Sequence, residues 1–422
     1  MGRTWVTRSG TARALGPIVY FALGCAGTAP GHAPQAATRT QAAPTFAGDS
    51  SELFDFPETT QSPRAMGDVP PALVPFFGQC KRGDAALSRL AERFARRQSE
   101  GRAPLDASEI SFALRAEGSP HMWPRTWTLE GEDFSSSAAV EQLRSWLDGW
   151  RDGGERRCGF ALVKTHERSV LGAVGVDVLA DLDPLPLRTR AGSWLDVSAQ
   201  LLVSASEAKL VVLGPSGAPF TVPTSLDGQH ARARFHADRP GAFLIQLLAN
   251  VAGGPRPVLE ATVYADVRPP TSFVSDPAPG EPRQPTPASS DVTVALLSMV
   301  NQARESEGSP ALVRDPALDE IALGHARAMR ALKRIAHDAG DGNPQSRVEA
   351  ASLSVLAAGE NVAHALDAVQ AHRVLWASPS HRENLLEPRY DRIGIGVAVD
   401  PDGSLWVCEV FADFPNQSAA AR

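Results

Sequence analysis

A dense group of polar residues lies near the end of the chain, in the segment 359–399 ("GENVAHALDAVQAHRVLWASPSHRENLLEPRYDRIGIGVAV"). The segment holds Glu360 and three histidines, and it ends in alternating apolar residues that are typical of a strand. Imidazole and carboxylate groups can act as general acids and bases or as metal ligands. The chain has no G-x-S-x-G nucleophile motif, and the Ser-Pro bend before His381 is better explained as a helix start. The segment therefore offers candidate acid–base or metal-binding groups without a serine nucleophile.

The segment "DPALDEIALGHARAMRALKRIAH" upstream of this group is predicted to be a helix. Asp315 suits the N-cap, and Pro316 suits the first helical position. Apolar residues recur at spacings of three and four, and His325 falls on the same face. A histidine in such a place is more often a hydrogen-bonded core residue than a ligand. We therefore expect His325 to be buried in the core.

Six motifs in order along residues 291–416 resemble the bacterial branch of the CAP superfamily, named for cysteine-rich secretory proteins, antigen 5 and pathogenesis-related proteins. No single motif is specific, and the resemblance rests on their common order. The motifs are "VNQARESEGSPALVRDPALDEIALGHARAM", "AH" ending at residue 337, "GENVA", "SPSHRENLL", "RIGIGVAV" and "WVCEVFA". The resemblance implies an α-β-α sandwich for this part of the chain.

The resemblance also implies a cleft in which His337, Glu360 and His381 converge. Many eukaryotic members have a second glutamate after a helix tryptophan, but this chain has "WASPSHR" there. Two imidazoles and a carboxylate can hold zinc with an open coordination position, and such sites hydrolyse amides and esters. The spacings of 23 and 21 residues are not a local metal motif, so only the fold could bring the three together. His364 and His372 are interpreted as solvated positions.

Three functions remain open for this cleft, and with them the question of whether the chain is an enzyme. We prefer binding of a small-molecule, lipid or peptide-like ligand at the cell envelope, with His337, Glu360 and His381 as a hydrogen-bonded cluster. The second is a hydrolase of peptide, ester or cell-wall bonds that uses zinc as cofactor. The third is an adhesive or structural envelope protein. A family resemblance marks the fold, to which different activities can be attached.

Residues 1–24 are predicted to be a signal peptide, because arginines precede an apolar run, "ALGPIVYFALG", that is too short to span a bilayer. The ending "ALGC" resembles a bacterial lipobox, which implies lipidation of Cys25 and a membrane anchor, in the outer membrane where a cell has two. A cleaved secretory leader is the alternative, and both imply export. Residues 25–70 are rich in Ala, Pro, Thr and Ser without periodicity and are predicted to be a disordered tether.

The 422-residue chain has a formal charge of −7, and loss of a leader with three arginines and no acids makes the mature chain more acidic. Such a chain is a poor generic binder of nucleic acid, and no nucleic-acid partner is expected. Export permits disulfides, so Cys80 and Cys158 are a candidate pair, with two separate buried thiols as the alternative. Cys408 lies in an apolar segment and is expected in the core.

The middle of the chain, residues 183–267, alternates apolar strands with turn signals about every ten residues, which predicts an immunoglobulin-like β-sandwich. In "HARARFHA" the histidines and arginines share one face, which we interpret as solvated. The proline-rich residues 268–290 are predicted to be a linker.

Residues 71–181 are predicted to be a degenerate CAP-like α+β domain, and hence an internal repeat. "DAALSRLAERFAR" matches "DPALDEIALGHAR", with Phe94 in place of His325. "GED" is aligned with "GEN", so that Glu132 takes the place of Glu360, while neither cleft histidine has a counterpart. The expected fold class of the chain is therefore multidomain α+β, with the sandwich between two CAP-like copies.

Overall fold

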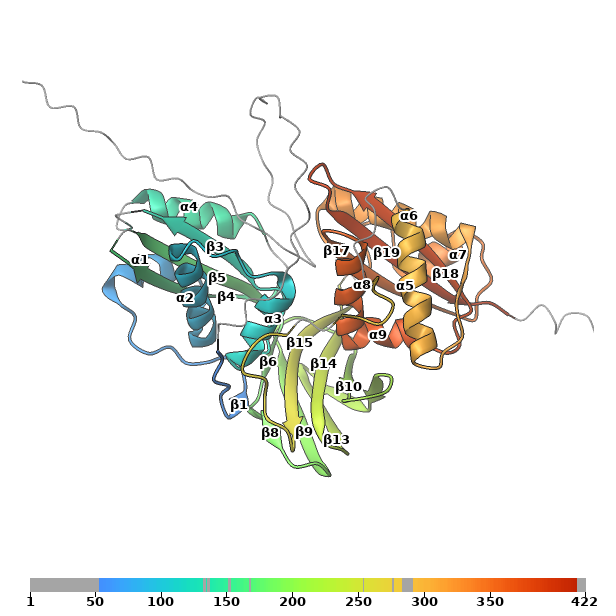
Figure 1. Ribbon diagram of the computed structural model, residues 1–422, viewed down its shortest axis with the longest axis horizontal. Helices are drawn as coiled ribbons and strands as arrows, with labels where there is room; N and C mark the ends of the chain where they lie inside the picture. The colour runs from blue at the N-terminus through green and yellow to red at the C-terminus, as the bar shows by residue number, and fades with distance from the viewer. Residues whose placement is uncertain are drawn as a thin grey trace, which may run out of the picture.

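The computed structural model describes residues 53–415, except for residues 132–133, 135–136, 151–152, 167, 253, 275–276 and 283–290. Three modules follow one another along the chain: an α+β module, a β-sandwich and a second α+β module. The sandwich lies below and between the other two in Figure 1. The expected signal peptide and Cys25 lie outside the described residues. Within the described part of the chain, no helix combines the length and the apolar character needed to cross a membrane.

The first α+β module has a four-stranded sheet of order β2-β4-β5-β3, in which only β2 and β4 are parallel. Helix α2 begins at Asp84, whose side chain accepts hydrogen bonds from two backbone amides, and it packs its apolar face on the sheet. The elements of this module are η1 (Pro71–Leu73), α1 (Val74–Phe77), β2 (Arg82–Gly83), α2 (Ala85–Ser99), α3 (Ala107–Ala116), β3 (Arg125–Glu130), α4 (Ser137–Asp148), β4 (Glu155–Lys164) and β5 (Ser169–Val178).

The tether predicted for residues 25–70 ends earlier than expected, because the chain takes part in the fold from residue 53 onward. Phe54 is buried against Phe112, with 5.1 Å between the ring centroids. The short strand β1 (Thr59–Thr60) pairs with β7 (Leu185–Pro186). Isolated aromatic residues whose partners lie far along the chain leave no periodic pattern in the sequence, so composition alone predicts a longer tether than the structure has.

Cys80 and Cys158 form a disulfide, with 6.1 Å between their Cα atoms. The bond joins the segment before β2 to strand β4 within the first module. Of the two alternatives that the sequence left open, the structure contains the pair. Cys408 is a free thiol in the core of the second α+β module.

Two facing sheets enclose the single core of the middle module. One sheet has the order β12-β13-β9-β6, and the other has the order β11-β10-β14-β15-β8. In "HARARFHA", Phe235 enters the core while Arg232 and Arg234 are exposed, as the alternation predicts. The remaining elements are β6 (Ala180–Leu182), β8 (Arg188–Thr189), β9 (Ser193–Leu201), β10 (Ala208–Leu213), β11 (Phe220–Val222), β12 (Thr224–Asp227), β13 (His230–Ala237), β14 (Gly241–Val251) and β15 (Gly254–Ala265).

The second α+β module has a four-stranded sheet of order β16-β18-β19-β17, in which only β16 and β18 are parallel. Helices α6 and α7 pack on one face, and α5, α8 and α9 pack on the other, which gives an α-β-α arrangement. Its elements are α5 (Val292–Ser306), β16 (Val313–Arg314), α6 (Pro316–Leu332), α7 (Pro344–Ala350), β17 (Ala357–Ala365), α8 (Ala368–Ala377), α9 (Pro379–Leu386), β18 (Arg392–Val399) and β19 (Leu405–Asp413).

The two α+β modules share strand order and strand directions, but their register corrects the predicted alignment of "GED" with "GEN". In the second module Glu360 stands opposite Val410, and the equivalent position of the first module is Thr126, opposite Val174. Glu132 lies outside the described residues, beyond the end of β3. Backbone pairing and the buried face set the register, and a short similarity of letters does not report on either.

Part of the predicted linker, residues 268–290, is packed on the second α+β module. The carbonyl of Pro279 accepts a hydrogen bond from Nε2 of His372 at 2.8 Å, and Glu281 forms an ion pair with Arg373 at 2.5 Å. His372 is completely buried, so its interpretation as a solvated position is wrong. A docked linker restricts how the second module can move relative to the sandwich.

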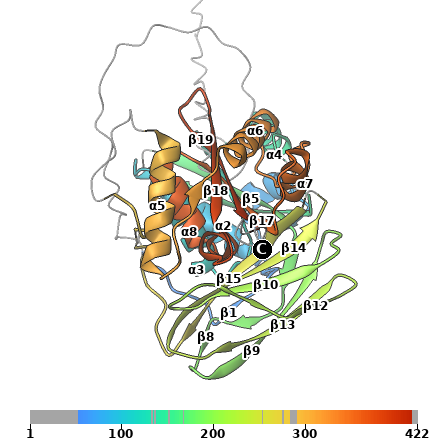
Figure 2. The same cartoon turned by 90° about the vertical axis from the view of Figure 1, so that its right-hand side faces the viewer.

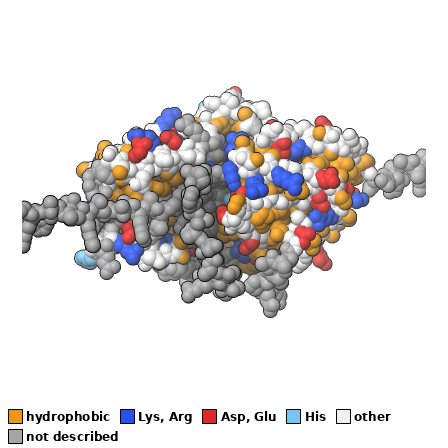
Figure 3. All heavy atoms as spheres, turned by 90° about the horizontal axis from the view of Figure 1, so that it is seen from above, with side chains coloured by type: hydrophobic (Ala, Val, Ile, Leu, Met, Phe, Trp, Pro, Cys, Tyr) orange, Lys and Arg blue, Asp and Glu red, His pale blue; other side chains and the backbone are white. Residues whose placement is uncertain are grey.

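The face seen from above the two α+β modules mixes acidic, basic and apolar side chains (Figure 3). On neither module do the charged side chains of the described residues form a large patch of a single sign in this view. Charge therefore marks no site on this face, in contrast to the polar groups gathered inside the second module.

Candidate functional site

Three elements carry the expected cleft residues of the second α+β module. Helix α6 ends at Lys333, whose left-handed backbone (φ 53°) turns the chain into the loop that holds His337. Glu360 lies in β17, at the edge of the sheet. Helix α9 holds His381, with proline at the first helical position.

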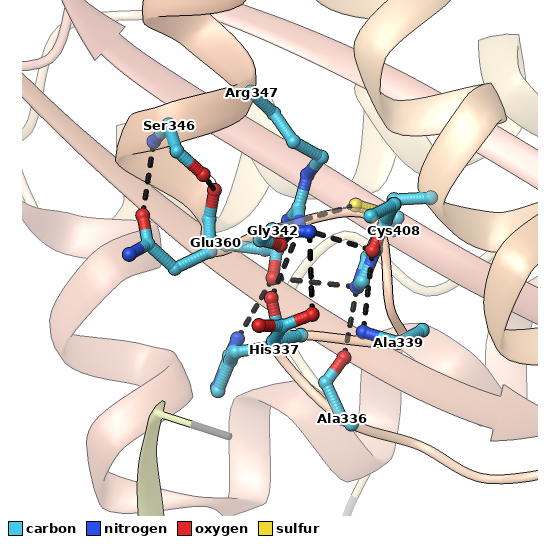
Figure 4. Close-up of polar contacts among 12 residues, drawn as sticks. Ala336, His337, Ala339, Gly342, Ser346, Arg347, Glu360 and Cys408 are labelled. Atoms are coloured by element: carbon cyan, nitrogen blue, oxygen red, sulfur yellow. Dashed lines mark hydrogen bonds and ion pairs between the residues drawn. The ribbon is translucent and has the colours of Figure 1, made fainter. Parts of the chain in front are cut away.

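The carboxylate of Glu360 is the centre of a buried polar cluster (Figure 4). Its Oε1 accepts a hydrogen bond from Nδ1 of His337 at 2.8 Å, and its Oε2 forms an ion pair with the guanidinium of Arg347. The thiol of Cys408 donates to Oε2 at 3.4 Å. Glu360 is only 4% exposed, so protein groups rather than water balance its charge.

The environment of this cluster fixes its protonation states. Burial alone would raise the pKa of Glu360, but the hydrogen bond from His337 and the nearby positive charges outweigh burial and lower it. Burial, followed by the charge of Glu360, raises the pKa of Cys408 well above its usual value. At neutral pH the glutamate is ionised and the cysteine is a protonated thiol, so Cys408 offers no thiolate nucleophile.

His325 is completely buried, as its place on the apolar helix face predicts. Its Nδ1 lies 2.8 Å from the carboxylate of Asp341, and its Nε2 lies 2.8 Å from the carbonyl oxygen of Ala336. Both partners are hydrogen-bond acceptors, so they hold the ring from two sides. Nε2 also lies 3.7 Å from Glu360, which joins His325 to the cluster. Asp341 was not predicted, because a loop aspartate carries no periodic signal.

A second group of buried polar side chains holds α9 against β17. Nδ2 of Asn384 donates to the carbonyl of Glu360 and to Oδ1 of Asn361, both at 3.0 Å, and Asn361 donates to the carbonyl of His381 at 3.1 Å. Glu409 lies 3.4 Å from Asn361, and burial raises its pKa to about 7. Sequence reasoning missed Glu409, although a glutamate inside the apolar strand "WVCEVFA" is a signal that could have found it.

The cluster does not fit the zinc site that the resemblance implies. His337 and Arg347 engage the two oxygens of Glu360, and a guanidinium beside the carboxylate repels a cation. Over the residues that the structure describes, no group of three or more His, Cys, Asp or Glu side chains is arranged to share a metal ion. His337 and His381 are imidazoles without a third ligand in this arrangement.

His381 forms part of the wall of a cavity of about 320 Å³. Its Nδ1 is buried and has no hydrogen-bond partner in the described structure. Burial, and then the charge of His337, lower the pKa of His381 to about 3, so its ring is neutral. All three modules and the linker supply apolar wall residues, among them Met122, Leu244, Pro257, Phe273, Val374 and Leu375.

The sandwich closes the side of the second α+β module on which α8 and α9 lie. Helix α8 lies above the sandwich in both ribbon views (Figure 1 and Figure 2). Glu383 of α9 forms an ion pair with Lys209 at 2.6 Å and accepts a hydrogen bond from Thr221 at 2.7 Å. At the start of β15, a Cβ placed on Gly254 would lie 3.4 Å from Cβ of His337. The expected cleft therefore faces the sandwich.

A separate buried cluster ties the first module to the sandwich. Arg157 is completely buried and forms a bidentate ion pair with Asp181 at 2.6 and 2.8 Å. The hydroxyl of Ser62 donates to Asp181 at 2.7 Å and lies 3.1 Å from Nε2 of His121. A serine and a histidine meet here, but the hydroxyl is buried and engaged by the aspartate. The cluster is therefore an anchor between modules.

His121 is expected to make stability depend on pH. Burial is the largest cause that lowers its pKa, from 6.5 to about 4. As the pH falls, the unfolded chain takes up a proton at His121 before the folded chain does. The contribution of the neutral His121 to the free energy of unfolding is therefore complete above pH 6.5 and is lost as the pH falls toward 4. Between pH 7.5 and pH 5 the free energy of unfolding should drop by about 2 kcal/mol through this residue.

Denaturant unfolding at both pH values measures this drop. The drop should be smaller in His121→Gln and unchanged in His230→Gln, a control at an exposed histidine. An equal drop in all three proteins would contradict the assignment.

Comparison with known proteins gives one family. The model of the cysteine-rich secretory protein family, CAP, matches residues 297–410. No curated protein matches the sequence. Similar solved structures include an outer surface protein from Borrelia burgdorferi, with 21% identity, 29% of this chain and 93% of that chain covered, and a TM-score of 0.28. An extracellular protein containing an SCP domain from Bacillus anthracis has 16% identity, coverage of 67% and 97%, and a TM-score of 0.27.

A cysteine-rich secretory protein from Staphylococcus aureus has 11% identity, coverage of 56% of this chain and 83% of that chain, and a TM-score of 0.26. At such scores the structural likenesses add no argument beyond the family model. The α-β-α arrangement of the matched segment and the ordered motifs within it agree with that model. Residues 297–410 form a domain of the cysteine-rich secretory protein (CAP) family.

Proposed function

We propose that this CAP-domain protein binds a small apolar or peptide-like ligand in the cavity beside His381, which we call the junction cavity. One observation carries the proposal: a cavity of about 320 Å³ with largely apolar walls lies where the three modules meet, and His381 is among the residues that line it. Pockets of this kind, apolar with a few polar groups, are the usual form of small-molecule sites.

The chemistry of the cavity narrows the ligand. His381 is neutral, so it offers a ligand no charge. Gln246 and Glu260 also line the cavity, and each already has partners: Arg115 bonds Glu260 at 2.5 Å, and the amide of Gln246 lies 3.2 Å from Glu260. The fitting ligand is an uncharged, largely apolar molecule.

In this proposal Glu360, His337 and Arg347 support the site from within the CAP domain and do not touch the ligand. The hydrolase alternative needs Glu360 as a metal ligand or general base, but its ion pair with Arg347 and its hydrogen bond from His337 leave it committed. The hydrolase alternative makes a distinct prediction, namely that the purified chain binds one equivalent of zinc.

We also propose that the chain is exported and held at the cell envelope through Cys25, after removal of residues 1–24. The lipobox-like "ALGC" and the absence of periodicity in the residues that follow support this. The intact mass of the protein from membranes tests it: a chain that begins at Cys25 with added acyl groups is expected, and an unmodified chain with another N-terminus would contradict it.

Two assignments of the other modules belong to the same proposal. The sandwich orders β6-β9-β13-β12 and β11-β10-β14-β15 follow the ABED and C′CFG orders of immunoglobulin-type domains, which supports that type. The identical strand order and directions of the two α+β modules support a degenerate CAP-like copy in residues 71–181. In that copy Thr126 stands in place of Glu360 and Phe94 stands in place of His325, so the buried polar cluster is not formed there. A copy without this cluster can serve as part of the wall of the junction cavity.

The ligand proposal predicts binding of N-phenyl-1-naphthylamine, an uncharged aromatic amine whose fluorescence rises in apolar surroundings. Titration of the full chain should give saturable, one-site binding. Leu244→Trp fills the cavity from the sandwich and Ala377→Phe fills it from α8, so each should weaken binding at least tenfold, by about 1.4 kcal/mol.

Val267→Trp is the matched control, because Val267 is an exposed sandwich residue outside the cavity lining. Its affinity should equal that of the parent. Binding that is unchanged in both filling variants, or lost equally in the control, would refute the junction cavity as the site.

A further inference from the structure

Two large aromatic side chains, one from each sheet of the sandwich, are exposed. Trp194 of β9 is 58% exposed and Phe220 of β11 is 43% exposed. Exposed apolar groups of this size are costly to leave in water, and when they gather on one surface they mark an interaction site. Both belong to the lining of one surface hollow of about 610 Å³.

Trp194 is held as a flat platform. It stands opposite His236 on the neighbouring strand β13, and the two rings stack with 4.8 Å between centroids and 18° between planes. The guanidinium of Arg234 lies 5.4 Å from the centre of the indole. A cross-strand stack and a cation near the ring fix the orientation of the indole before any ligand arrives.

A second surface hollow adjoins the first. It has a volume of about 590 Å³, shares Pro223 and Arg234 with the first hollow and is lined by residues of β9, β12 and β13. Its lining includes the hydroxyl residues Ser198, Thr224 and Ser225. We call the two hollows together the sandwich groove. Two adjoining open hollows, one of them with an aromatic platform, suit a chain of repeated units better than a single compact molecule.

Four of the five charged side chains that line the sandwich groove occur as two ion pairs, and the fifth is Arg232. Arg234 lies 3.4 Å from Asp196, and Arg239 lies 2.7 Å from Asp238. These guanidinium and carboxylate groups can donate and accept hydrogen bonds in fixed planes. Because both signs are present and four of the five charges are paired, the lining suits an uncharged ligand rich in hydroxyl groups.

We propose that the sandwich groove binds a neutral glycan chain. One pyranose ring packs against Trp194, and the neighbouring sugar units lie along β13. A pyranose ring has a face of C–H bonds, which matches the electron-rich face of an indole, and a rim of hydroxyls, which matches the paired arginine and aspartate side chains. The exposed tryptophan, the adjoining hollow and the mostly paired charges each fit this ligand class. The site is separate from the junction cavity and does not depend on the proposed function.

The test is binding of the fluorescently labelled full chain to a printed array of neutral and acidic glycans, with phosphatidylcholine and phosphatidylglycerol vesicles as a parallel probe. The parent should bind neutral glycans, and Trp194→Ala should lower the apparent affinity at least tenfold. Trp194→Phe, which keeps an aromatic face, should lose less. Val267→Ala, an exposed apolar residue of the same module outside the groove, should bind as the parent does.

Each other outcome overturns the proposal. Binding to no neutral glycan removes the ligand class, and equal binding by Trp194→Ala removes the platform. Binding confined to acidic glycans and abolished by salt would show a polyanion site, and vesicle binding that depends on Trp194 would show a membrane contact. Thermal unfolding of every variant, expected to match the parent because Trp194 is exposed, separates loss of binding from loss of fold.

Discussion

Arg347→Met is expected to destabilise the CAP domain by about 3–5 kcal/mol, the usual loss when one partner of a buried ion pair is removed. Glu360 would keep its negative charge in an environment where it is only 4% exposed, with the ring of His337 and the thiol of Cys408 as its remaining donors. Arg347 also donates to the carbonyls of His337 and Gly342, so its removal loosens the loop that holds the cleft histidine. Differential scanning calorimetry of the full chain resolves the transition of this domain.

Two further variants separate charge from packing. Adding Glu360→Gln to Arg347→Met removes the stranded charge and should recover part of the loss. Arg389→Met breaks an exposed ion pair with Glu387 and should leave the melting temperature unchanged, because solvent screens such pairs. If Arg347→Met and Arg389→Met melted alike, the Glu360 cluster would not be the buried support described here.

Gly394→Ala and Gly159→Ala are expected to destabilise their modules by about 3 kcal/mol each, because both force extra atoms into a packed contact. A Cβ on Gly394 would overlap the backbone of Leu318 in α6, and a Cβ on Gly159 would overlap the backbone of Leu87 in α2. The two glycines allow a helix to lie directly on the equivalent strand of each module. Equal losses would show that both modules depend on the same close helix-to-sheet contact.

Gly324→Ala supplies the matched control. Gly324 lies in α6 with no atom near the position of an added Cβ, so alanine should stabilise the helix by about 1 kcal/mol through its higher helix propensity. Opposite signs for Gly394→Ala and Gly324→Ala, measured by calorimetry, are the expected pattern. A neutral Gly394→Ala would mean that the helix can move off the sheet without cost.

The elements of the CAP domain could be read from the sequence because local chemistry specifies them. Asp315 and Pro316 start α6, and the apolar spacing buries His325, as predicted. Strand alternation likewise predicted the burial pattern of "HARARFHA". Each of these signals lies within a single element, where periodicity and capping decide the outcome.

The site was harder to predict because it depends on contacts between distant segments. The junction cavity joins Leu244, Phe273 and Val374, which belong to three separate parts of the chain. Sequence spacing contains no information on how modules dock, and the same limit explains the burial of Phe54 and His372. The misplacement of Glu132 has another cause, since strand register depends on pairing with β5 and not on local similarity.

Native mass spectrometry with elemental analysis of the purified full chain tests the central claim most directly, that the junction cavity holds a ligand and the Glu360 cluster is its support. A bound organic molecule that Leu244→Trp loses, with zinc well below one equivalent, is the predicted result. One equivalent of zinc that both His337→Ala and His381→Ala lose, with no organic ligand, would contradict the claim and support a metal-dependent hydrolase.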